Sequence, residues 1–223
     1  MTSSVPGFGR LIMKDHFLIF KDCLKRLFDI CFSSLVLVAL LPLYILIALA
    51  IKISSTGPIF FGSRRLGKGG KLIICWKFRT MCQDAEEVLA TLLEKDPSLK
   101  KEWSSFAKLK HDPRTTMLGK YLRRFSIDEL PQFWNVLKGD LSIVGPRPYL
   151  VEEIQNQVGE KSHKILSVRP GITGVWQISG RSNLTLEQRI TMEADYVDNR
   201  GFFKDLILIF KTFPCLFFPR GAY

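Results

Sequence analysis

The chain has 223 residues, of which 47% are hydrophobic and 24% are charged, and its mean hydropathy is +0.11. This length suffices for one ordinary domain with a core, and the hydropathy is high for a water-soluble protein with so many charges, so we expect a polar body attached to a membrane. The five cysteines are odd in number and form no C-x-x-C pair, which argues against a disulfide framework and favours a reduced, cytosol-facing body. The three histidines match no metal-ligand spacing.

The formal net charge of +11 is unevenly distributed. Basic residues exceed acidic ones by nine between positions 52 and 124, directly after the most apolar segment. Such a region suits anionic lipid head groups or phosphorylated substrates and, on charge alone, nucleic acid. Because no nucleic-acid-binding motif accompanies it and its aromatic residues are few, no nucleic-acid partner is expected.

Residues 1–24 are mixed in character, and we expect an N-terminal interfacial segment there, with a frayed terminus as the alternative. Residues 30–51 carry no charge, and these 22 residues could span a bilayer as a straight helix of about 33 Å. Pro42 lies near the middle, where it would kink a helix. Basic residues flank both ends, so the positive-inside rule would keep both on the cytoplasmic face. We therefore predict a re-entrant helix-break-helix over residues 25–53, broken at Pro42; a kinked spanning helix is the alternative.

Residues 57–81 are predicted to form two strands around a Gly-Lys-Gly-Gly turn, residues 67–70. A glycine-rich turn with lysines could cradle phosphate, but its spacing is not that of a Walker A motif, and a plain hairpin is the simpler interpretation. Lys77 and Arg79 follow within the basic region. Residues 83–95 then have the apolar spacing of a short amphipathic helix.

The stretch from Tyr121 to Tyr149 carries most of the predicted chemistry, because it holds the adjacent acids Asp128 and Glu129. Either Ser126 and Glu129 form a capping box or Asp128 is itself an N-cap, and both alternatives place Asp128 at a helix N-terminus, where the carboxylate stays ionised. A carboxylate can attack phosphorus if cations offset the repulsion. The candidate cations are Arg123, Arg124, Arg147 and a divalent metal. A simple helix cap is the alternative.

Beyond this stretch, residues 151–168 are expected to form a surface helix. The glycine-rich segment 168–181 follows, with Arg169, Gln177 and Arg181 among apolar residues. It is interpreted either as a loop that approaches a nucleotide or diphosphate or as a structural loop. Residues 202–218 combine aromatic residues with lysines, which fits a helix lying in a membrane interface.

The run LRRFSIDELPQFWNVLKGDLSIVGPRP closely resembles the signature of the bacterial sugar transferases, the monotopic phosphoglycosyl transferases. The resemblance extends from about Lys25 to Thr212 and includes the Lys-Phe-Arg-Thr-Met and Pro-Gly-Ile-Thr-Gly runs. It departs from the family pattern at Ser63, where glutamine is usual, and at Arg200-Gly201, where Trp-Ser is common. The fold that this implies is α+β and mainly helical, with a small β-hairpin or sheet, the re-entrant segment and interfacial amphipathic helices.

The resemblance implies a two-step reaction. Asp128 would attack the sugar-proximal phosphorus of a UDP-sugar, giving a phosphosugar-aspartyl enzyme and UMP, and polyprenyl (undecaprenyl) phosphate would then accept the sugar phosphate. Glu129, with Asp128, would bind Mg²⁺, and Arg123 and Arg147 would stabilise phosphate charge. The full set of expected substrate-binding residues is Lys77, Arg79, Arg123, Arg124, Arg147, Arg169, Gln177 and Arg181.

The resemblance also implies an inner-membrane enzyme whose residues 54–223 form one catalytic domain on the cytoplasmic face, ending in the interfacial tail. UDP-sugar, undecaprenyl phosphate and membrane lipids are the expected partners, and a homodimer is left open. A plain hexose is the favoured sugar, and capsule, O-antigen or another surface glycan would be the product. An inactive membrane assembly protein of the same fold is the alternative. A retaining glycosidase is disfavoured because Asp128 and Glu129, as neighbours on a helix, diverge by about 100°.

Overall fold

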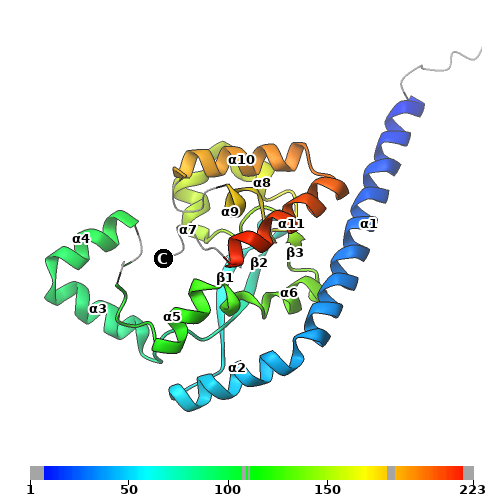
Figure 1. Ribbon diagram of the computed structural model, residues 1–223. Helices are drawn as coiled ribbons and strands as arrows, with labels where there is room; N and C mark the ends of the chain where they lie inside the picture. The colour runs from blue at the N-terminus through cyan, green and yellow to red at the C-terminus, as the bar shows by residue number, and fades with distance from the viewer. Residues whose placement is uncertain (1–7, 107–108, 110, 180–183, 218–223) are drawn as a thin grey trace, which may run out of the picture.

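The computed structural model describes residues 8–106, 109, 111–179 and 184–217, and this part of the chain is mainly helical, as predicted, with two small sheets (Figure 1). The α-helices are α1 (Phe8–Ala39), α2 (Leu41–Ser54), α3 (Ala85–Lys95), α4 (Pro97–Phe106), α5 (Met117–Arg124), α6 (Gln132–Lys138), α7 (Val151–Glu153), α8 (Ser162–Ile165), α9 (Val175–Ile178), α10 (Leu186–Asp198) and α11 (Phe202–Phe217). The strands are β1 (Phe60–Leu66), β2 (Leu72–Phe78), β3 (Ser142–Val144) and β4 (Gly171–Thr173). The short turns are η1 (Lys68–Gly70), η2 (Ile127–Glu129), η3 (Ile154–Val158) and η4 (Gly159–Lys161).

Helices α1 and α2 form a bent pair that runs along and beneath the body (Figure 1). The bend is 60° and lies at Leu40, two residues before the predicted break. Pro42 instead occupies the first turn of α2, where its missing N–H removes no helical hydrogen bond. Among the described residues no single helix is both long and apolar enough to cross a membrane, although the bent pair meets that test together. Insertion as a re-entrant segment, and an interfacial role for residues 1–24, stay predictions.

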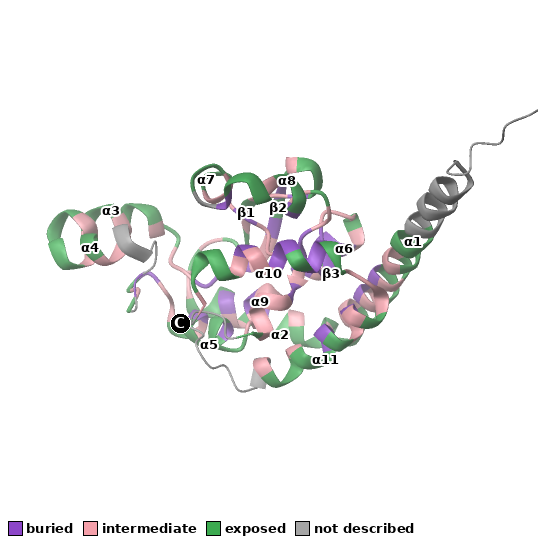
Figure 2. Ribbon diagram, turned by 90° about the horizontal axis from the view of Figure 1, so that it is seen from above, coloured by how far each residue is buried: buried purple, intermediate pink, exposed green. Residues whose placement is uncertain are grey.

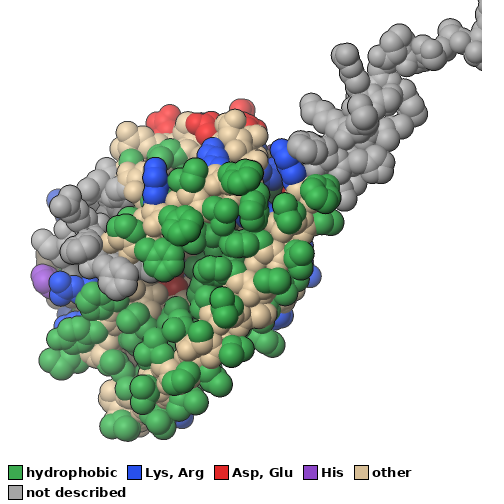
Figure 3. Space-filling view, turned by 45° about the vertical axis from the view of Figure 1, so that its right-hand side comes forward, with side chains coloured by type: hydrophobic (Ala, Val, Ile, Leu, Met, Phe, Trp, Pro, Cys, Tyr) green, Lys and Arg blue, Asp and Glu red, His purple; other side chains and the backbone are tan. Residues whose placement is uncertain are grey.

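Helix α11 confirms the helix predicted for the tail, and it lies against α1. The rings of Phe28 and Phe202 meet edge to face at 5.4 Å, and Lys25 of α1 forms an ion pair with the buried Asp205 of α11. Large exposed apolar side chains lie on α1, α2 and α11, among them Leu35, Leu46 and Phe210. Figure 3 shows hydrophobic side chains gathered over one broad face, with lysines and arginines at its edges. This face is available to an apolar environment.

The predicted hairpin is present: β1 and β2 pair antiparallel from Phe60 opposite Phe78 to Leu66 opposite Leu72. Alternate residues of a strand point to the same face of a sheet. Ile73 and Cys75 of β2 face inward and are buried, and Lys77 lies on the same side of the strand. The alternation that buries the inner face of β2 therefore also directs the ammonium group of Lys77 into the body.

The second sheet was not predicted; it pairs β3 and β4 parallel, with Ser142 opposite Gly171 and Val144 opposite Thr173. Its strands are too short for a periodic pattern to show. The backbones approach closely here, because a Cβ atom at Gly171 would lie 2.1 Å from the nitrogen of Gly145. The glycine-rich segment that was interpreted as a loop thus begins with a strand and continues into α9.

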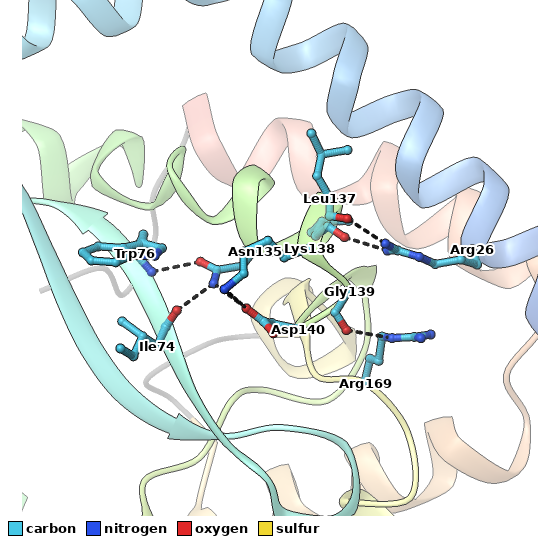
Figure 4. A network of polar contacts seen from close by, with 10 residues as sticks. Arg26, Ile74, Trp76, Asn135, Leu137, Lys138, Gly139, Asp140 and Arg169 are labelled. Atoms are coloured by element: carbon cyan, nitrogen blue, oxygen red, sulfur yellow. Dashed lines mark hydrogen bonds and ion pairs between the residues drawn. The ribbon is translucent and has the colours of Figure 1, made fainter.

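The main core joins buried side chains of β2, α6, β3, α10 and α11 (Figure 2). Asn135 of α6 is fully buried and bonds to the backbone of β2: its Oδ1 accepts the Trp76 N–H at 3.0 Å, and its Nδ2 donates to the Ile74 carbonyl at 2.6 Å (Figure 4). Helix α6 is thereby fixed to the hairpin. Helix α3, which confirms the helix predicted at residues 83–95, projects with α4 from the body (Figure 2).

The surface helix predicted for residues 151–168 is confirmed in part, because the segment is helical over residues 151–165 but is not one continuous helix. The chain forms α7, η3, η4 and α8 instead, and Gly159 interrupts the helix at a φ of 61°. Val158 and Ile165 are buried with Tyr149, Ile190 and Ala194 in a second small core. Charged residues are spread through this segment, so its sequence did not indicate that Val158 and Ile165 are buried.

Candidate active site

The acid pair lies in η2, between α5 and α6. The capping predictions are wrong: Ser126 adopts a left-handed conformation (φ 57°) and its hydroxyl caps nothing in the described part of the chain, while Pro131 takes the N-cap position of α6. Glu129 is held elsewhere, by Lys77. Asp128 nevertheless lies in the first turn of a helical run that continues into α6, and its own backbone N–H helps to lower the pKa of its carboxyl.

The side chain of Asp128 is buried, with 7% of the residue exposed. Burial raises the pKa of this carboxyl to about 6, against the opposing effects of the Lys77 and Arg123 charges. Its neighbours Ile127 and Leu130 pack against Ile47 and Ile51 of α2. The carboxylate is therefore poorly solvated, yet mostly ionised at neutral pH.

Glu129 and Lys77 form an ion pair with 2.6 Å between Oε1 and Nζ. Desolvation opposes the charge of Glu129, whose side chain is 36% exposed, but the charges of Lys77, Arg147 and Arg65 together outweigh it and hold the pKa of Glu129 below its ordinary value. Burial likewise opposes the charge of Lys77, and the two acids outweigh it and raise the pKa of Lys77. The charge of Lys77 thus acts on both Asp128 and Glu129, and it helps to keep both carboxylates ionised.

Two of the predicted arginines accompany the acids. Arg123 of α5 donates from Nε to the Thr80 hydroxyl at 2.8 Å, and its charge acts on Asp128. Arg147 follows β3, and its charge helps to lower the pKa of Glu129. Arg124 instead extends over the Phe125 ring, with its guanidinium carbon 5.7 Å from the ring centre.

A buried acid, Glu193 of α10, holds the segment that carries Arg147. Pro146 and Pro148 lack backbone N–H groups, so the Arg147 N–H is the one backbone donor of this tripeptide, and it donates to Glu193 Oε1 at 2.8 Å. The Tyr149 hydroxyl donates to Glu193 Oε2 at 2.5 Å. Burial raises the pKa of Glu193 to about 7. The two hydrogen bonds to Glu193 fix the position of the Arg147 backbone after strand β3.

Sequence reasoning missed Arg65, Glu153 and Glu193. The guanidinium of Arg147 lies 3.2 Å from Glu153 Oε1, and Arg65 lies 3.6 Å from Glu153 Oε2. The charge of Arg65 also helps to lower the pKa of Glu129. The alternation of the hairpin could have identified Arg65, because it shares a face with Lys77. Glu153 and Glu193 carried no such signal.

The other predicted substrate-binding residues are dispersed. Arg169 donates from Nε to the Gly139 carbonyl at 2.9 Å, and Arg26 donates to the Val136 and Leu137 carbonyls, so both lie at the C-terminal end of α6, away from the acid pair (Figure 4). Gln177 lies on α9 beside Gly174. Arg181 lies outside the described residues.

Arg79 is buried next to the end of α2, where its Nη2 donates to the carbonyl and hydroxyl oxygens of Ser55 at 2.8 Å each. It therefore follows Lys77 along the chain but contacts the end of the bent helix pair.

Across the described residues, no group of three or more His, Cys, Asp or Glu side chains could hold a metal ion. A pair of adjacent carboxylates nonetheless fits Mg²⁺, which commonly takes one or two protein carboxylates and completes its shell with water and substrate phosphates. Asp128 and Glu129 form such a pair, surrounded by cations suited to phosphate. The donor set thus fits a metal that arrives with a phosphorylated substrate.

The model of the family described as bacterial sugar transferase matches residues 20–219. The chain is 41% identical to the exopolysaccharide production protein ExoY of Sinorhizobium fredii, over 89% of this chain and 88% of that protein. It is also 41% identical to the undecaprenyl-phosphate galactose phosphotransferase of Salmonella typhimurium and 38% identical to the UDP-glucose:undecaprenyl-phosphate glucose-1-phosphate transferase of Escherichia coli. In both comparisons the match covers 90% of this chain, but 42% and 41% of those longer proteins. The chain is therefore a transferase that belongs to the bacterial sugar transferase family.

Proposed function

We propose that the protein transfers a sugar-1-phosphate, most simply a hexose-1-phosphate, from a UDP-sugar to undecaprenyl phosphate on the cytoplasmic face of the inner membrane. The observation that carries the proposal is the buried Asp128, ionised at neutral pH and set beside the Lys77–Glu129 ion pair. Relatives that match most of this chain are named as undecaprenyl-phosphate sugar phosphotransferases, which supports the same substrates here. The product would start a surface polysaccharide.

In the first step an Asp128 carboxylate oxygen attacks the sugar-proximal phosphorus of the donor. A bond forms between that oxygen and phosphorus, and the bond from phosphorus to the bridging diphosphate oxygen breaks, so that UMP leaves with the bridging oxygen. Poor solvation of Asp128 favours this attack. Lys77, Arg123 and Arg147 offset the charge that gathers on the phosphate oxygens.

In the second step a phosphate oxygen of the lipid acceptor attacks the same phosphorus. The bond to the Asp128 oxygen breaks, which frees the carboxylate and yields the polyprenyl diphosphate sugar. Two successive displacements at one phosphorus thus leave the enzyme unchanged. Glu129, together with Asp128, would hold Mg²⁺, which when bound neutralises part of the diphosphate charge.

The apolar face of α1, α2 and α11 supports placement of this chemistry at a membrane surface. The phosphate of a polyprenyl lipid stays at the interface, so the enzyme must bring its nucleophile there. The packing of Ile127 and Leu130 on α2 connects the acid pair directly to that face.

The test is UMP release by the purified protein in detergent with Mg²⁺, undecaprenyl phosphate and a panel of UDP-sugars. Release with one sugar, abolished in Asp128→Asn and retained in Asp198→Asn, is the expected result. Asp198 is a suitable control because it forms an exposed ion pair with Lys164, far along α10. Normal turnover by Asp128→Asn would refute the nucleophile. No UMP release by the folded wild-type protein with any sugar of the panel would favour the alternative that the protein is an inactive membrane assembly protein.

A further inference from the structure

The segment of residues 55–58 joins α2 to the strand β1, and we call it the exit loop. Two cations hold it: Arg79 through the Ser55 oxygens, and Lys52, whose Nζ donates to the Gly57 carbonyl at 3.0 Å. Neither cation has a carboxylate within ion-pair distance among the residues that the structure describes. The exit loop therefore lies between two positive charges without a negative partner.

Arg79 is 7% exposed, and two of its three guanidinium nitrogens, Nε and Nη1, are buried without a hydrogen-bond partner in the described part of the chain. A guanidinium remains charged in a folded protein, and a buried charge that lacks a partner is strongly destabilising. Capping the end of α2 explains the contacts of Nη2 alone. Nε and Nη1 point to different edges of the planar group, because Nη1 lies on the side of Cδ, so each of them can donate to an acceptor of its own. Nη2 shares an edge with Nη1, so these two nitrogens can grip two oxygens of one phosphate once Ser55 has moved away from Nη2.

The exit loop closes directly over this guanidinium. Gly57 has a φ of +111°, and a Cβ atom there would lie 2.2 Å from Arg79 Nη1. The backbone thus covers the nitrogen, and a ligand reaches Nη1 when the exit loop moves outward. Two contacts oppose such movement: the exposed Lys52 bond to the Gly57 carbonyl and the part-buried Arg79 bonds to Ser55.

Arg79 lies between the acid pair and the apolar face. Its N–H donates to the Ile59 carbonyl at 2.8 Å, so the strand ladder extends past β2, and residues two apart in a strand lie about 7 Å apart on one side. Lys77, which holds Glu129, is two residues before Arg79. Ile53, the residue before the last of α2, is 87% exposed.

From these observations we infer that Arg79, Lys52 and the exit loop form the binding site for the phosphate group of the lipid acceptor, a phosphate monoester on an apolar chain. The chain would lie along the apolar side of α2, and the phosphate would enter beside Arg79 as the exit loop opens. This inference rests on the proposed function. It separates the acceptor site from the arginines that surround the donor diphosphate.

The two half-reactions provide the test. With UDP-sugar and no lipid, enzyme forms its intermediate and releases one burst of UMP; lipid is needed only for continued turnover. Arg79→Lys keeps the positive charge and loses the planar guanidinium donors. This variant should retain the UMP burst and keep the KM for UDP-sugar within twofold. Its KM for undecaprenyl phosphate should rise at least tenfold. Lys52→Gln, at an exposed site, should raise the lipid KM about threefold, and Lys164→Gln should change neither constant.

An unchanged lipid KM in both Arg79→Lys and Lys52→Gln would overturn the inference, as would a burst that declines in parallel with turnover. A wild-type protein that shows no burst with any UDP-sugar would refute the proposed function instead, so the two failures are distinguishable.

A binding measurement gives a readout that does not depend on turnover. Hydrogen exchange in residues 52–57 should slow when undecaprenyl phosphate is added in detergent, and should not change with undecaprenol, which lacks the phosphate. Equal slowing by inorganic phosphate would show that the site selects the anion without its lipid chain and would overturn the assignment to the acceptor.

Discussion

The hydroxyl of Tyr44 in α2 donates a 2.6 Å hydrogen bond to the carbonyl oxygen of Leu130, the residue that follows the acid pair. Tyr44 lies close to the bend between α1 and α2, and Leu130 also packs against α2. The acid pair is therefore attached to the second arm of the bent pair by a polar and an apolar contact. A displacement of α2 should therefore also displace Asp128.

Tyr44→Phe tests this attachment. The ring should remain packed beside Phe78, 5.5 Å away, while the Leu130 carbonyl loses its donor. We expect a loss of about 1 to 2 kcal/mol in the free energy of unfolding and a several-fold lower kcat, measured by thermal unfolding and UMP release. Tyr121→Phe is the matched control, because Tyr121 is 57% exposed. Unchanged kcat in Tyr44→Phe would show that the bond does not position the acid pair.

Asp128→Asn should stabilise the protein while abolishing activity. The pKa of Asp128 is raised to about 6, so folding favours its protonated form: that stabilisation is fully present below the unfolded pKa near 4 and is lost as the pH rises through 6. At pH 8 the neutral amide should therefore raise the free energy of unfolding by about 2 kcal/mol. Denaturant unfolding at pH 8 measures the change, and equal or lower stability would contradict the burial argument.

The rate of UMP release should fall on the acid side of pH 6, because only ionised Asp128 is a nucleophile. Below that pH the single-turnover rate should decrease about tenfold per unit. Lys77→Met removes the cation that stabilises the ionised form, so the inflection should move to higher pH. A rate that stays flat to pH 5 in wild type would exclude Asp128 as the titrating group.

Glu193→Leu should displace Arg147 while leaving the arginine side chain itself unchanged. The Arg147 N–H and the Tyr149 hydroxyl would lose their acceptors, which should lower stability by about 2 to 4 kcal/mol and raise the KM for UDP-sugar. Glu193→Gln keeps one acceptor for the N–H and offers a donor to the tyrosine oxygen, so its KM should stay within threefold of wild type. Stability and steady-state kinetics of both variants provide the comparison. Equal KM effects in the two variants would argue against this positioning role.

Much of the fold followed from local pattern. The hairpin, α3 and α11 were predicted because glycine turns and apolar spacing act within a few residues. The bent pair was predicted from a proline in an uncharged segment. The break itself lies at Leu40, and Pro42 occupies the first turn of the second helix. The β3–β4 pairing escaped prediction because it depends on backbones that meet across about 30 residues.

The site was partly predictable for the same reason. The sequence named Asp128, Glu129, Lys77, Arg123 and Arg147 as candidates, and the structure brings them together: the charges of Lys77 and Arg123 act on Asp128, and those of Lys77 and Arg147 act on Glu129. The predicted capping box does not form, and Glu129 pairs instead with Lys77, 52 residues earlier in the chain. Glu193 could not be anticipated, since its partners come from another element. Their catalytic roles stay predictions until the variants are measured.

The glycine contacts of the parallel sheet have a consequence for how this enzyme can diversify. Any side chain at Gly171 or Gly174 would collide with the backbone of Gly145, at 2.1 and 2.3 Å. At Gly69 in the hairpin turn, by contrast, an added Cβ meets nothing within 4 Å among the described atoms. Because Gly69 has a φ of +71°, a side chain there meets backbone strain but no collision, so a random library should keep a few turn variants, Asn and Asp above all, and lose almost every member altered in the sheet. New sugar preferences would have to arise from side chains around this rigid frame, since the frame itself cannot vary.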